Sequence, residues 1–238
     1  MHSSPTAAVD AARGSAPRRL AVALAGVAVV VVGLSLLTRW LAWRRELGTP
    51  GIAPPWWLQY FDVNTEMNLP TWFNGGLLVV TGVVTLVVAS LHRPTHPRVA
   101  RFLGLLGAGL LLLSLDELTG LHERLGGLVG SGLHFTWVLP GLALAVVALV
   151  LLVRGLRAVS PADRRPFLLA AVLFFTGALV LETVSGQVLL AHGDRAGYLL
   201  VTAAEELLEM LGVVVALYAV LRLVRSRRDG AGWRVSPA

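Results

Sequence analysis

Long apolar stretches separated by short polar segments dominate this chain. A bilayer core about 30 Å thick needs about 20 apolar residues at helical rise, and six stretches meet or approach that length. They lie at 20–42, 71–91, 101–121, 135–154, 167–191 and 197–223. The pattern therefore predicts an all-α fold, a polytopic membrane helix bundle with about six transmembrane helices.

The remaining segments divide the chain into three parts. Residues 1–19 mix Ser, Pro, Ala and Gly with charges, a composition typical of disordered segments. The transmembrane domain is predicted over 20–225, with an extracytoplasmic loop at 43–70, and a basic tail follows at 226–238. Because the first apolar run is longer than the apolar core of a signal peptide, we expect it to be a retained helix.

The arginines predict the orientation of the helices. With the N terminus inside, fifteen of the 20 basic residues fall in cytoplasmic segments, and short positively charged loops stay on that side of a membrane. Both termini are therefore predicted to be cytoplasmic.

The composition agrees with a membrane protein and excludes reactions that depend on cysteine. The chain is 55% hydrophobic and has no cysteine, which excludes disulfides, cysteine-ligated iron–sulfur clusters and thiol nucleophiles. Its formal net charge of +6 comes from arginines in short loops between apolar stretches. Such positive loops orient a membrane protein, so the charge does not indicate nucleic-acid binding. The expected partner is the lipid bilayer, and nothing in the sequence identifies a protein partner.

Acidic residues gather in the predicted extracytoplasmic half of the bundle. A charge inside a bilayer costs about 2.5 kcal/mol or more, so the charges that persist usually face the bundle interior and often serve function. The predicted topology brings acids on the third, fifth and sixth helices to a similar depth. The resulting candidates for a metal or proton site are Asp116, Glu117, His122, Glu123, Glu182, Glu205, Glu206 and Glu209.

Three hypotheses account for such a cluster. In the first, the carboxylates and His122 bind a divalent metal ion that supports hydrolysis of a lipid-type substrate, although the spacing lacks the motifs of di-iron bundles and zinc proteases. Whatever the site holds, its predicted counter-ion is Arg195. In the second hypothesis, the protein is a proton- or cation-coupled transporter. The apolar cytoplasmic halves of the three acid-bearing helices argue against this. In the third, the acids form a structural polar cluster in a non-catalytic membrane protein. Because all three hypotheses fit the pattern, the sequence leaves open whether the chain is an enzyme.

Three segments resemble an uncharacterised family of bacterial multipass membrane proteins, over roughly residues 60 to 220. They are Glu66–Phe73, Ser114–Glu123 and Glu205–Gly212. The resemblance implies a bacterial cytoplasmic (inner) membrane protein and no particular activity. It also implies that Glu66, Asn68 and Trp72 lie beside the acids as accessory residues.

Overall fold

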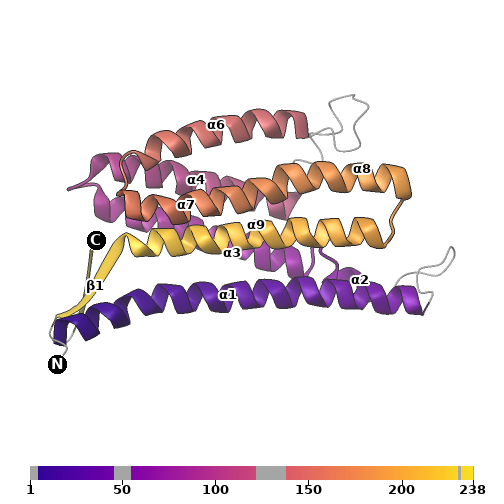
Figure 1. The fold of residues 1–238 in the computed structure, drawn as a ribbon, viewed down its shortest axis with the longest axis horizontal. Coiled ribbons are helices and arrows are strands. Elements are labelled where there is room, and N and C mark those ends of the chain that lie inside the picture. Colours follow the sequence, from indigo (N-terminus) through magenta and orange to yellow (C-terminus); the bar gives the residue numbers. More distant parts are fainter. Residues whose placement is uncertain (1–4, 46–54, 122–137, 230–231, 238) are drawn as a thin grey trace.

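The computed structural model describes residues 5–45, 55–121, 138–229 and 232–237. Long helices run side by side in this part of the chain, and the start of α1 lies at the same end of the bundle as β1 (Figure 1). The short α2 (Trp56–Phe61) lies toward the opposite end. The other helical elements are α1 (Pro5–Arg44), α3 (Leu69–His92), α4 (Pro97–Thr119), α6 (Val138–Leu156), α7 (Pro161–Phe175), the π-helix η1 (Thr176–Leu181), α8 (Glu182–His192) and α9 (Ala196–Arg222).

The predicted helical fold is confirmed. Within the described ranges, four helical segments are long and apolar enough to cross a membrane: Ser15–Arg44, Leu69–His92, Pro97–Thr119 and Pro161–His192. The other two predicted stretches are also helical where they are described. Of these, α6 has a shorter apolar segment, Gly141–Leu156, and α9 carries three glutamates that interrupt an otherwise apolar helix.

Two helix starts differ from the sequence prediction. The first helix begins at Pro5 rather than near residue 20, since the alanines before Leu20 favour helix. The fifth begins at Pro161 rather than after Pro166, because the side chain of Ser160 caps it by accepting a hydrogen bond from Asp163 N at 3.3 Å.

The tail contains a hairpin that the sequence analysis did not predict. Its strands, β1 (Val224–Asp229) and β2 (Gly232–Pro237), are antiparallel, with Val224 opposite Pro237 and Asp229 opposite Gly232. Apart from this hairpin, the regular structure of the described residues is helical.

Helix α9 is the central element, because it contacts α1, α3, α7 and α8. Small residues set the closest approaches between helices. A Cβ on Gly82 of α3 would lie 3.1 Å from the carbonyl oxygen of Gly107 in α4, and a Cβ on Gly212 of α9 would lie 2.8 Å from the backbone nitrogen of Phe174 in α7. Glycine thus holds α4 against α3, and α7 against α9.

Candidate functional site

Three helices bring their carboxylates together toward the end of the bundle that is opposite the β-hairpin. Asp116 and Glu117 lie in the last turn of α4, Glu182 is the first residue of α8, and three glutamates lie in the first half of α9. The charge of Glu117 acts on both Glu206 and Glu209, and that of Glu182 acts on all three glutamates of α9. We call these six residues the carboxyl cluster: Asp116, Glu117, Glu182, Glu205, Glu206 and Glu209.

Glu205 is the most enclosed member of the carboxyl cluster. Its side chain is buried, and its carboxyl group lies beside the carboxyl of Glu182 and the Ser185 side chain. The Ser185 hydroxyl itself donates to the backbone carbonyl of Glu182 at 2.9 Å. An ionised carboxylate only accepts hydrogen bonds, so two neighbouring carboxyl groups can bond to each other only when a proton lies between them.

The π-helix η1 lies directly before Glu182 and packs against the acid-bearing turn of α9. A Cβ on the buried Gly177 would lie 2.7 Å from the backbone oxygen of Glu205 and 2.7 Å from Cγ of Glu209. A π-turn inserts an extra residue into the helix and rotates everything that follows it, and such turns are frequent at functional sites. No sequence signal marks this turn, although it sets the rotation at which Glu182 meets α9.

The described charges that act on Glu205, Glu206 and Glu209 are all acidic. Arg195, the predicted counter-ion, is exposed at the N-cap of α9 and forms no ion pair with another described residue. Like charges in a low dielectric cannot all remain ionised without a cation or a proton. The carboxyl cluster therefore has to hold protons, bind a cation or pair with a basic side chain outside the described residues.

A metal centre has less support within the described ranges. They contain no group of three or more His, Asp or Glu side chains arranged to hold a metal ion. His122 and Glu123, which the sequence analysis placed in the metal site, lie outside the described residues. Their part in the hypothesis stays a prediction.

The accessory residues have separate positions. Asn68 caps α3 by accepting from Thr71 N at 3.1 Å, and its amide nitrogen donates to the carbonyl oxygen of Asp62 at 2.6 Å. Glu66 lies against Gly120, whose φ of 55° ends α4, and a Cβ on that glycine would collide with the Glu66 carboxyl. Glu66 thus lies beside the acid-bearing end of α4, whereas Trp72 is exposed.

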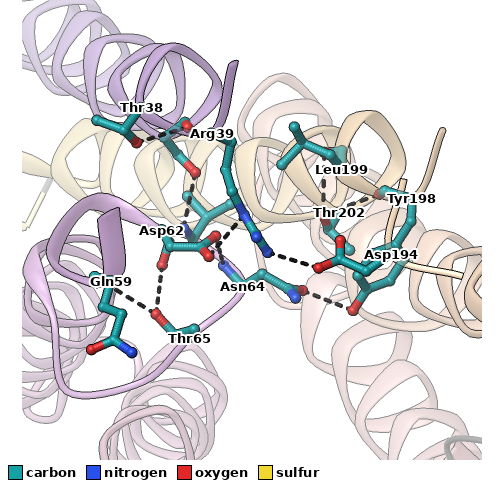
Figure 2. Close-up of polar contacts among 12 residues, drawn as sticks. Thr38, Arg39, Gln59, Asp62, Asn64, Thr65, Asp194, Tyr198, Leu199 and Thr202 are labelled. Atoms are coloured by element: carbon teal, nitrogen blue, oxygen red, sulfur yellow. Dashed lines mark hydrogen bonds and ion pairs between the residues drawn. The ribbon is translucent and has the colours of Figure 1, made fainter. Parts of the chain in front are cut away.

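A second polar group, which we call the outer network, joins α1, the segment before α3 and the α8–α9 corner (Figure 2). Arg39 Nε lies 3.0 Å from Asp62 Oδ2, and Arg39 Nη2 lies 3.4 Å from Asp194 Oδ2. Asn64 N donates to Asp62 Oδ1 at 3.1 Å, and the Tyr198 hydroxyl donates to Asn64 Oδ1 at 2.9 Å. Arg39 was not among the residues singled out from the sequence, since nothing local links it to acids so distant in the chain.

Burial and charge oppose each other at Asp62. Only 3% of this residue is exposed, and its burial raises the pKa of its carboxyl above the ordinary 3.8, while Arg39 and the amide of Asn64 pull that pKa down. The attraction of Arg39 therefore only partly offsets the cost of removing the Asp62 carboxylate from water.

Tyr198 connects the outer network to the carboxyl cluster. Its hydroxyl bonds Asn64 on one side, and the same residue lies within electrostatic range of Glu205 and Glu182. Tyr198 belongs to the first turn of α9, two turns before Glu205 and Glu206. Polar groups thus continue from Asp62 at the bundle end to the acids of α9.

Comparison with known proteins gives one match. A family model described as a domain of unknown function (DUF8692) matches residues 22–223. No curated protein and no solved structure matches the chain. The matched range contains the whole carboxyl cluster and the outer network, and it ends before the β-hairpin.

Proposed function

The chain belongs to the DUF8692 family of domains of unknown function, and we propose that it is a multi-pass membrane protein that moves protons through its carboxyl cluster, as a proton-coupled transporter does. The observation that carries this proposal is the gathering of six carboxyl groups from three helices, with those of Glu182 and Glu205 side by side, in a cluster whose described charged neighbours are acidic. Intramembrane acids of this kind are the usual proton carriers of pumps and transporters.

A membrane position is supported by the length and direction of the helices. Four helical segments are long and apolar enough to span a bilayer, and α6 and α9 run beside them (Figure 1). The start of α1 and the end of α9 lie at one end of the bundle, which fits an even number of crossings. The arginine distribution supports a cytoplasmic location for that end, and the family resemblance supports a bacterial plasma membrane.

Electrostatic repulsion explains why the carboxyl cluster binds protons. Two unit charges 4 Å apart repel by about 4 kcal/mol at an effective dielectric constant of about 20. A proton shared between the neighbouring Glu182 and Glu205 carboxyls removes this repulsion. Because Glu206 and Glu209 bring further negative charge from the same helix, the number of bound protons can change as the surroundings of the cluster change.

The two other hypotheses have less support. A metal-dependent hydrolase would need a set of ligands, and the described residues contain no group of three suited to a metal. A purely structural cluster would be expected to satisfy its polar atoms, yet the buried Oε2 of Glu205 has no hydrogen-bond partner among the described residues.

The proposal is tested with a hydrophobic carbodiimide, which reacts with protonated carboxyl groups in apolar surroundings. We expect labelling of the carboxyl cluster in wild-type protein, located by peptide mass spectrometry, and strongly reduced labelling in E205Q. In proteoliposomes that contain a pH-sensitive dye, proton flux along an imposed pH gradient should also be lost in E205Q.

The matched control is D163N. Asp163 pairs with Arg222 at 2.9 Å near the hairpin end of the bundle, far along α9 from the carboxyl cluster, so this variant should keep both labelling and flux. A wild-type protein that is folded but shows neither signal would refute the proposal. Stoichiometric metal in wild-type protein that E205Q loses would favour the metal hypothesis instead.

A further inference from the structure

Helix α3 carries a row of buried polar side chains that the carboxyl cluster does not include. Asn74, Thr81, Thr85 and His92 are spaced by seven, four and seven residues, which places them on one face of the helix. Their exposed fractions are 1%, 0%, 0% and 4%. We call these four residues the α3 row, and it follows almost the whole length of α3.

Two oxygen atoms of the α3 row have no hydrogen-bond partner within the described part of the chain. They are Oδ1 of Asn74 and Oγ1 of Thr81, both fully enclosed. A buried polar atom without a partner destabilises a protein, and valine would fill the same space as Thr81 without that penalty. Packing alone therefore does not account for the hydroxyl at this position.

The other two members have defined hydrogen bonds. Thr85 Oγ1 donates to the carbonyl oxygen of Thr81 at 2.6 Å. Nδ1 of His92 lies 2.9 Å from the carbonyl oxygen of Val88, and because a carbonyl only accepts, Nδ1 carries the proton. In the neutral ring Nε2 is then left with a lone pair that can accept a proton.

The α3 row begins beside the carboxyl cluster and ends at the opposite end of the bundle. Next to Asn74, the carbonyl oxygen of Gly75 accepts a hydrogen bond of 2.9 Å from Ser114, two residues before Asp116. Residues Leu77 and Leu78 then pack with Val213 and Val214 of α9, one turn beyond Glu209. Helices α3 and α9 run in the same direction (Figure 1), so Thr81, Thr85 and His92 lie progressively nearer the hairpin.

We propose that the α3 row is the inner half of a proton path, which leads from the carboxyl cluster to His92. This inference rests on the proposed function. It also answers the objection that the inner halves of the acid-bearing helices are apolar, because a different helix supplies the polar groups.

Proton transfer along the row also requires water. Intervals of seven and four residues correspond to about 10 and 6 Å of helical rise, whereas one hydrogen bond spans about 3 Å. Bound water molecules therefore relay the proton between side chains. In each transfer between oxygens one O–H bond breaks as the next forms, and in the last an O–H bond breaks as an N–H bond forms at Nε2 of His92. The net result is a carboxylate in the cluster and an imidazolium at His92.

The test compares T81V with T81S in proteoliposomes that contain a pH-sensitive dye. T81V removes only the hydroxyl at nearly constant volume, so we expect proton flux to fall about tenfold or more, while T81S keeps flux near the wild-type rate. H92Q should slow flux as T81V does. T183V is the matched control, because Thr183 is exposed and donates to the Leu179 carbonyl of its own helix, and it should leave flux unchanged.

Carbodiimide labelling separates failure of this inference from failure of the proposed function. We expect T81V and H92Q to keep wild-type labelling of the carboxyl cluster. If flux depends on Glu205 but T81V and H92Q conduct at the wild-type rate, the α3 row is structural and the inference is wrong. If wild-type protein shows neither flux nor labelling, the proposed function itself fails. Should T81V not fold, H92Q and T81S decide the outcome.

Discussion

The contact between η1 and α9 allows a quantitative prediction for Gly177. A Cβ at this position would lie 2.7 Å from the backbone oxygen of Glu205 and 2.7 Å from Cγ of Glu209. The glutamate side chain can move, but the backbone oxygen cannot, so G177A must push η1 away from α9. Overpacking of this kind costs about 1–3 kcal/mol.

Gly109 of α4 provides a control with the same chemical change. A Cβ there meets nothing within 4 Å, and replacing glycine by alanine inside a helix stabilises by about 0.5–1 kcal/mol. The free energies of unfolding of G177A and G109A should therefore differ by about 2–4 kcal/mol. Only G177A should also weaken carbodiimide labelling of Glu205, because it separates this residue from Glu182.

Reversible unfolding in mixed micelles, followed by circular dichroism, measures both free energies under the same conditions. Equal stability of G177A and G109A would refute the reasoning, since it would mean that η1 does not approach α9 as closely as the structure has it. Reduced stability with unchanged labelling would show that the contact supports packing but does not position Glu205.

Two further predictions concern the outer network. R39Q leaves the buried Asp62 without its ion-pair partner, so we expect the free energy of unfolding to fall by an amount on the order of 3 kcal/mol. The double variant R39M/D62L, which replaces both charges by apolar side chains, should recover most of this loss. An unchanged free energy of unfolding in R39Q would contradict the pairing. Burial raises the pKa of Asp62 above 3.8, so its contribution to stability is fully present below pH 3.8 and is lost as the pH rises through the raised pKa. The Tm of wild type minus that of D62N should fall over this pH range, and a difference that rises instead would contradict this sign.

Much of the fold could be read from local sequence. Each apolar stretch of about 20 residues is helical where it is described, because length and hydropathy are properties of the stretch itself. The similar depth of the acids followed from alternating helix direction, and α4, α8 and α9 do bring them together. The spacing of Asn74, Thr81, Thr85 and His92 was also present in the sequence, but it became informative only once this face of α3 proved to be buried.

The sequence by itself determined that this chain forms long apolar helices with acids gathered toward one end. Only the tertiary structure decided that Glu205 meets Glu182, that Arg39 pairs with Asp62 and Asp194, and that Thr81 is enclosed. The physical reason is that hydropathy fixes where a helix lies along the chain, whereas its rotation about its own axis depends on neighbouring helices. Here that rotation is set by close contacts at glycines such as Gly177 and by the π-turn before Glu182, which only the packed bundle reveals.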